Sequence, residues 1–98
     1  MVIDEESSSG IASGVTGLSV RIYPNPAGDE ATLAFIGGSG GKAILRLVSH
    51  DGREVWSVSR GSLTEGEERI SLKGYSRGLY FLVTETAEEV IIRPLIRQ

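Results

Sequence analysis

The sequence is poor in the residues that most catalytic and metal sites need. It has no cysteine and a single histidine, and its aromatic residues are two phenylalanines, three tyrosines and one tryptophan. Without cysteine the chain cannot form disulfides, thiolate nucleophiles or zinc–thiolate sites, although the cellular compartment stays open. A single histidine leaves little for an imidazole-rich metal site or a serine triad. We therefore predict no catalytic residues, no metal site and no cofactor, and a protein that is not an enzyme.

Long apolar runs and an excess of basic charge are also missing. No run approaches the roughly 20 apolar residues of a membrane-spanning helix, and no opening stretch has the pattern of a signal peptide. The formal net charge is −3, and the excess comes from Asp4, Glu5 and Glu6, because the remaining acids balance the ten lysines and arginines. Binding to phosphates requires a basic stripe, which this sequence lacks. We predict neither membrane insertion nor binding to nucleic acid.

The 98 residues suffice for one small domain, because the commonest domain size is roughly 100–150 residues. Residues 1–17 carry acids, serines and glycines with only scattered apolar residues, and they show neither a helical nor a strand period. This composition is typical of a flexible linker. The predicted domain therefore comprises residues 18–98.

Short runs of β-branched, aliphatic and aromatic residues, separated by turn signals, predict an all-β fold. Apolar residues nowhere recur at a helical spacing for two clear turns, so we predict no substantial helix. Strands are expected at residues 19–23, 31–35, 43–47, 54–59, around 70–72, at 79–83 and at 90–96. This pattern favours an immunoglobulin-like antiparallel β-sandwich of about seven short strands, with a small barrel as the other solution.

The expected core depends on which side chains share a sheet face. The inward positions are predicted to be Leu45, Leu47, Phe81 and Val83. Truncation of Phe81 to alanine would then cost about 3–5 kcal/mol. Residues 79–83 are apolar at every position, which favours a central strand covered on both faces. Val55 and Val58 cannot share a face without a bulge, so the side of Trp56 stays open.

The last expected strand contains Pro94, which withholds a ladder donor and therefore predicts an edge strand or a bend. By alternation, one face carries Val90, Ile92 and Ile96. The other face carries Arg93, Leu95 and Arg97. We expect one face to dock on the sandwich, while the other shows two arginines and one apolar side chain to a partner, since a guanidinium holds a carboxylate through two parallel hydrogen bonds. A plain edge strand, whose arginines oppose aggregation, explains the same pattern.

Several residues are of types found in catalytic, phosphate-binding or calcium sites, but their positions favour ordinary surface turns and loops. His50, beside the Asp51-Gly52 turn, is expected at the surface. The glycine-rich residues 37–41 precede a strand and not a helix, so they form a loop without a phosphate cradle. The acid clusters are Asp29-Glu30, Glu65 with Glu67-Glu68, and Glu85 with Glu88-Glu89. They lack the spacing of a calcium loop, and we expect them in solvated turns.

Three short motifs occur in order along the chain. The first strand closes on Tyr23-Pro24-Asn25-Pro26, a hairpin turns at Asp51-Gly52-Arg53, a strand opens on Gly78-Leu79-Tyr80, and a basic and apolar tail follows to Gln98. Each motif alone is a strand terminator, a tight turn or a strand entry. Together, over residues 18–98, they resemble the C-terminal sorting domain of type IX secretion cargo, which is found in the Bacteroidetes.

The resemblance implies a non-enzymatic secretion signal attached to an N-terminal cargo domain that lies outside this sequence. The cargo would cross the periplasm and then reach the cell surface or the medium. The implied partners are the type IX outer-membrane translocon and a sortase-like cysteine peptidase, which removes the domain and attaches the cargo to the surface. The alternative function is an adhesive or carbohydrate-binding β-sandwich, in which Trp56, Tyr75 and Tyr80 would stack on sugars.

The resemblance also assigns roles to residues. The translocon would recognise the tail residues Arg93, Pro94, Leu95, Ile96, Arg97 and Gln98. The peptidase would cut in the linker, around Ser7, Ser8, Ser9, Gly10, Ile11, Ala12, Ser13 and Gly14, because proteolysis needs an accessible chain. We expect deletion of residues 95–98 to block export and to leave most of the sandwich folded, and Arg93→Glu with Arg97→Glu to weaken export without touching the core. An exposed last strand could also pair with a second copy in an edge-strand homodimer.

Overall fold

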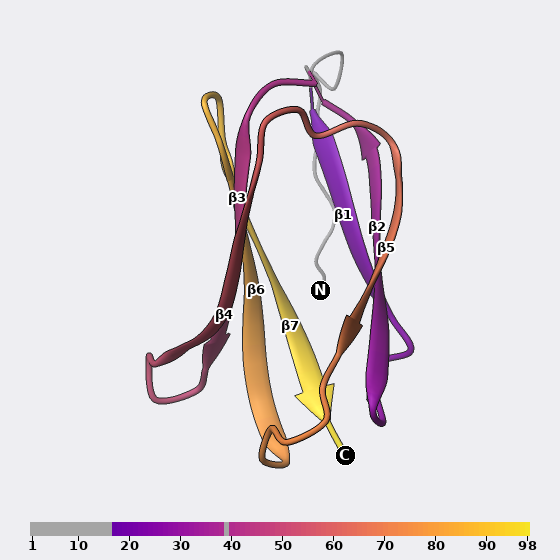
Figure 1. The fold of residues 1–98 in the computed structure, drawn as a ribbon, viewed down its shortest axis with the longest axis vertical. Coiled ribbons are helices and arrows are strands. Elements are labelled where there is room, and N and C mark those ends of the chain that lie inside the picture. The colour runs from indigo at the N-terminus through magenta and orange to yellow at the C-terminus, as the bar shows by residue number, and fades with distance from the viewer. Residues whose placement is uncertain (1–16, 39) are drawn as a thin grey trace.

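A computed structural model describes residues 17–38 and 40–98, which contain seven strands and no helix. The strands are β1 (Leu18–Tyr23), β2 (Glu30–Gly37), β3 (Ala43–Ser49), β4 (Glu54–Arg60), β5 (Gly66–Ser71), β6 (Gly78–Thr86) and β7 (Val90–Arg97). They form two antiparallel sheets, ordered β1-β2-β5 and β4-β3-β6-β7, which face each other (Figure 1). The prediction of an all-β sandwich is confirmed. The described part of the chain has no helix that could span a membrane, and the predicted cleavage region at residues 7–14 lies outside it.

Successive strands run in opposite directions, and this sorts the connections between the two ends of the sandwich (Figure 1). The chain enters β1 at Leu18 at one end. The β1–β2, β3–β4 and β5–β6 connections and the end of β7 all lie at the other end, which we call the motif end. Each of the three sequence motifs therefore begins or ends there, although they are separated by more than 20 residues along the chain.

The core lies between the inner faces of the two sheets. Its largest fully buried side chains are Leu33, Leu45, Leu47, Leu72, Leu82, Leu95, Val20 and Thr84. Complete burial of a leucine side chain stabilises a fold by roughly 1.5–3 kcal/mol. Six of these eight side chains are leucines. The burial of Leu45 and Leu47 was predicted correctly.

The predicted inward positions on β6 are wrong. Leu82 lies opposite Leu47, and Thr84 lies opposite Leu45, in the β3–β6 ladder. Residues directly opposite each other in a ladder share a sheet face, so the even-numbered residues of β6 join the core. Phe81 and Val83 are half-buried on the outer face instead. Because residues 79–83 are apolar at every position, their sequence contains no alternation that could identify the inner face.

The bulge that the valines of β4 require is present. The register of β3 with β4 shifts between Leu47 and Val48, since Leu47 lies opposite Trp56 whereas Val48 lies opposite Glu54. The extra residue is Val55, and it packs against the core together with Trp56. The sequence left the sheet face of Trp56 undecided, and the structure places this side chain on the inner face, opposite Leu47.

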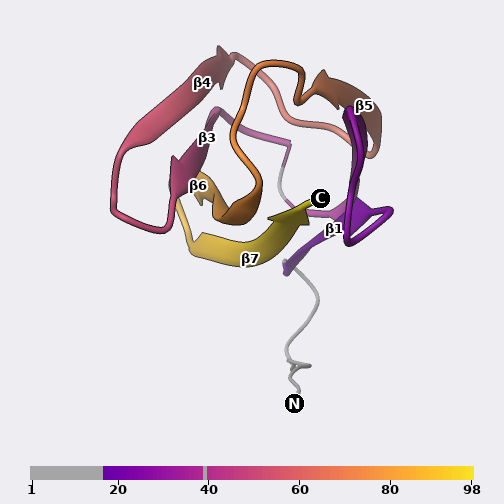
Figure 2. The ribbon, with the colours of Figure 1, turned by 90° about the horizontal axis from the view of Figure 1, so that it is seen from below.

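The sandwich has two open sides, one between β4 and β5 and one between β1 and β7 (Figure 2). An arginine bridges each of them. On the side of β4 and β5, the Nε atom of Arg60 donates to Glu68 at 3.0 Å, and a second guanidinium nitrogen bonds the same carboxylate. On the side of β1 and β7, the Nε atom of Arg93 donates to the carbonyl oxygen of Val20 at 3.0 Å. Arg60 thereby links the edge strands β4 and β5, and Arg93 occupies one backbone acceptor on the free edge of β1.

Candidate functional site

The last strand, β7, is an edge strand, and Pro94 costs it no bond to β6. The N–H and C=O groups of Ile96 both point away from β6, because their partners are Asn25 and Ala27. Pro94 lies two residues earlier and presents its carbonyl oxygen to the same side, where Asn25 binds it. The missing N–H of the proline is therefore on the free side, as the prediction of an edge strand requires.

The Tyr-Pro-Asn-Pro motif holds this free edge. The side-chain amide of Asn25 donates to the carbonyl oxygen of Pro94 at 3.0 Å, and its carbonyl oxygen accepts the N–H of Ile96 at 3.0 Å. Ala27 then continues the pairing, since its N–H donates to Ile96 at 2.7 Å and its C=O accepts the N–H of Gln98 at 2.8 Å. We call this set of four bonds the clasp. Through the clasp, the β1–β2 connection pairs with β7 as a neighbouring strand would.

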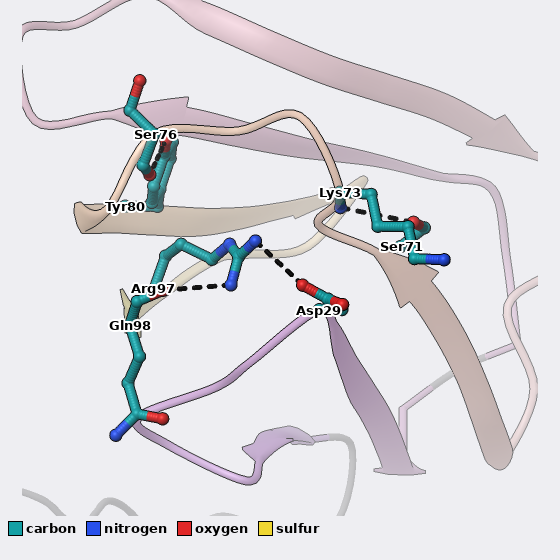
Figure 3. Close-up of polar contacts among 7 residues, drawn as sticks. All are labelled: Asp29, Ser71, Lys73, Ser76, Tyr80, Arg97 and Gln98. Atoms are coloured by element: carbon teal, nitrogen blue, oxygen red, sulfur yellow. Dashed lines mark hydrogen bonds and ion pairs between the residues drawn. The ribbon is translucent and has the colours of Figure 1, made fainter.

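Arg97 lies beside the clasp, and its guanidinium group binds other groups of the same domain (Figure 3). Its guanidinium bonds the carboxylate of Asp29 at 3.1 Å and the backbone oxygen of Gln98 at 3.0 Å. Only 14% of its side chain is exposed. Together with Arg93, which caps the edge of β1, Arg97 therefore has a structural role that the sequence did not indicate.

The predicted orientation of the last strand is reversed. Tyr80 faces the core and lies opposite Leu95, so Leu95 faces the core as well and is fully buried. The face with the arginines is thus the docked face, and the exposed face carries Val90, Ile92, Pro94 and Ile96. The alternation was predicted correctly, but its assignment to core and solvent was not, because both faces of the tail carry apolar residues.

The Asp51-Gly52-Arg53 motif forms the turn between β3 and β4. The backbone of Ser49 accepts from Gly52 at 2.9 Å and donates to Arg53 at 2.8 Å. The hydroxyl of Ser49 donates to Asp51, and this bond lowers the pKa of the Asp51 carboxyl group. Gly52 has a φ of +88°, which a side chain would strain. His50 is exposed in the same turn, as predicted.

The Gly78-Leu79-Tyr80 motif starts β6 and anchors it. Tyr80 is buried, and its hydroxyl donates to the carbonyl oxygen of Ser76 at 2.6 Å. Its ring lies 6.2 Å from that of Tyr75. Trp56 also packs against the core, so the three aromatic side chains do not present one exposed face to a sugar. These three residues, all in the described part of the chain, therefore do not form the aromatic platform that the carbohydrate-binding alternative requires.

Most members of the acid clusters are exposed to solvent, as expected, but they also make contacts within the domain. Glu85 pairs with Arg46 at 2.6 Å, and Glu67 accepts the hydroxyl of Tyr23, which raises the pKa of the tyrosine. Further contacts join Glu65 to the N–H of Gly37, Glu89 to the N–H of Leu18, Glu68 to Arg60 and Asp29 to Arg97. Sequence spacing gives no signal for these partners, because most lie more than 20 residues apart. Within residues 17–38 and 40–98, no three acidic or histidine side chains are placed to hold a metal ion.

Replacement of Asn25 by alanine removes half of the clasp. We expect the free energy of unfolding to fall by about 1–2 kcal/mol, because two neutral hydrogen bonds are lost. The amide hydrogen of Ile96 should exchange with solvent faster, whereas that of Leu82, inside the sheet, should keep its relative protection. Hydrogen exchange followed by NMR measures both. Unchanged exchange at Ile96 would contradict the clasp.

Comparison with known proteins adds two findings. The model of the secretion system C-terminal sorting domain family matches residues 21–98. Among solved structures, dimeric latent PorU from Porphyromonas gingivalis is similar, with a TM-score of 0.61 and 17% identity over 91% of this chain. The similar region is 10% of that chain, so the sequence spans about a tenth of its length. At this identity the likeness concerns the fold alone. No curated protein matches the sequence.

Proposed function

The chain belongs to the family of secretion system C-terminal sorting domains, and on this premise we propose that it is the removable export signal of a larger cargo protein. A type IX sorting signal is a cargo tail and not a catalytic domain, and it directs its cargo to the cell surface or the medium. The match over residues 21–98, which includes the whole last strand, is the observation that carries this proposal. The clasp supports it, because it links the first motif of the family resemblance to the tail.

The finer steps are part of the same proposal. Residues 18–98 fold as the sorting domain, and residues 1–17 link it to the cargo. The translocon recognises the domain through its last strand, including residues 93–98, after the cargo has crossed the periplasm. A sortase-like cysteine peptidase then cuts the linker within residues 7–14 and joins the cargo to the surface. The acidic, serine- and glycine-rich composition of the linker favours an accessible cut there.

A fusion experiment tests this function. Residues 1–98 are placed after a periplasmic reporter in a type IX-competent host, and the reporter alone serves as the control. We expect the fusion, but not the control, to reach the cell surface or the medium. Mass spectrometry of the released reporter should find its new C-terminus within the linker.

Two results would contradict the proposal. A reporter that stays in the periplasm when fused to the domain would rule out a sorting signal. A new C-terminus inside residues 18–98 would rule out the linker as the site of removal.

A further inference from the structure

The side chains of the tail divide into those that hold the domain together and those that do not. Leu95 is buried in the core, Arg97 binds Asp29, and Arg93 caps the backbone of Val20. A partner that binds the folded tail through these side chains would first have to break contacts that stabilise the fold. The alternate residues of β7 make no such side-chain contacts with the core and remain exposed.

The backbone edge of β7 is not free either. The clasp occupies the C=O of Pro94 and both backbone groups of Ile96, and Pro94 has no N–H to offer. Arg93 donates to the carbonyl oxygen of Ile92. A second strand cannot pair with this half of β7 while the clasp is closed, because the donors and acceptors it needs are taken.

The exposed side chains of β7 continue onto β6 as one apolar surface. In the β6–β7 ladder, Ile96 lies opposite Leu79, Pro94 opposite Phe81, and Ile92 opposite Val83. These six residues, with Val90 at the start of β7, form what we call the apolar stripe. Ile92 is 54% exposed and Ile96 is 47% exposed. The informative feature is that these apolar side chains are contiguous, because contiguous apolar patches on a domain surface are often functional whereas scattered apolar residues are not.

The surroundings of the stripe show which chemistry it fits. No residue of the stripe is charged. The nearest base on the same sheet face is Arg46, which lies opposite Val83, and its charge is compensated by Glu85 at 2.6 Å and Glu54 at 3.5 Å. A partner that covers the stripe therefore meets no unpaired charge along its length, so an apolar and uncharged surface complements it best.

The size of the stripe argues against a stable pair of identical domains. The eight residues of β7 span roughly 27 Å, and two strands are about 10 Å wide, which gives an area of about 270 Å². A standard stable interface buries about 800 Å² on each partner. The stripe alone is too small for such a dimer, whereas a short-lived contact during transport requires less area.

We propose that the apolar stripe, and not the arginines of the tail, is the surface by which the export machinery recognises the folded domain, and that the machinery presents an uncharged apolar surface to it. This inference rests on the proposed function. It assigns recognition to Ile92, Pro94 and Ile96 within the tail, and it adds Leu79, Phe81 and Val83 from a strand that precedes the tail.

Threonine substitutions test the inference in the reporter fusion. Ile92→Thr with Ile96→Thr removes apolar surface but keeps the β-branched shape that suits a strand. The matched control is Ile36→Thr on β2, because Ile36 is 53% exposed on the other sheet. We expect the double variant to lose export by about tenfold or more, and the control to be exported like the parent. The Tm of each isolated domain should stay within about 4 °C of the parent.

The possible outcomes separate the two proposals. Retention of the parent fusion in the periplasm would overturn the proposed function, and this inference with it. Export of the double variant at the level of an exported parent would overturn the inference alone. If the parent domain is a dimer by light scattering and the double variant is a monomer, a second copy covers the stripe, and that result also overturns the inference.

Discussion

Replacement of Leu95 by alanine is expected to lower the free energy of unfolding by about 2–5 kcal/mol, because this leucine is fully buried. A domain of this size has a total stability of roughly 5–15 kcal/mol, so the loss is a large part of it. Denaturant titration of the isolated domain measures the change. Ile96→Ala is the control in the adjacent position, and its expected cost is below about 1 kcal/mol, since its side chain lies on the outer face. Equal costs at the two positions would show that the orientation of β7 is wrong.

The burial of Leu95 changes what a truncated tail can reveal. Deletion of residues 95–98 removes this side chain and, in addition, the clasp bonds that Ile96 and Gln98 make. The deletion is therefore expected to unfold much of the domain, contrary to the expectation from sequence that only a strand end is lost. Reversal of both arginine charges also breaks contacts to Asp29 and Val20. Loss of export in these variants would report on folding, which makes the threonine variants of the stripe the better test of recognition.

Truncation of Leu82 should cost more than truncation of its larger neighbour Phe81. Leu82→Ala is expected to lower the free energy of unfolding by about 2–5 kcal/mol, because the leucine is fully buried between the sheets. Phe81→Ala should cost at least about 1 kcal/mol less, since Phe81 is half-buried on the outer face and leaves no closed cavity. This replaces the cost of about 3–5 kcal/mol that an inward Phe81 would have.

The denaturant midpoints of the two variants show which of the two side chains faces the core. Phenylalanine favours strands more than leucine does, so the loss of β-propensity alone would make Phe81→Ala the costlier change, and a smaller cost at Phe81 therefore reports on burial. A larger loss for Phe81→Ala would mean that β6 presents its odd-numbered residues to the core.

The strands could be predicted from sequence because their signals are local. Alternation in residues 31–35 identifies both the strand and its inner face, and turn residues such as Asp51-Gly52 fix where strands end. Pro94 predicted an edge strand, because the loss of one donor is tolerated only at an edge. Each of these signals depends on residues within a few positions of one another.

The details of the site could not be predicted, because they depend on distant partners. Asn25 and Pro94 are 69 residues apart in sequence, and no spacing rule indicates that an asparagine in a turn pairs with the last strand. The orientation of β7 follows from β6, whose own apolar residues show no alternation. The ladder partners in β3 determine which face of β6 is turned to the core. The sequence of β6 alone does not indicate that face.

The three motifs also acquire a common explanation from the fold. A sequence shows them as a strand terminator, a turn and a strand entry, each with a sufficient local reason. The structure adds that all three lie at the end of the sandwich where β7 finishes (Figure 1). The first motif contacts the tail through Asn25. The third pairs with the tail in the β6–β7 ladder, where Leu79 lies opposite Ile96 and Tyr80 lies opposite Leu95. The second forms the β3–β4 turn at the same end.

The opposite positions of Leu18 and the end of β7 have a mechanical consequence. A pull on the cargo and a counter-pull on the tail would act at the two ends of the sandwich, along its strands. Such a force slides β7 lengthwise past β6, so the eight residue pairs of that ladder resist it together. A force across the strands would open the pairs one after another. If the domain is transported with its cargo as proposed, tension along the chain would therefore load this ladder in shear, the direction in which its residue pairs resist together.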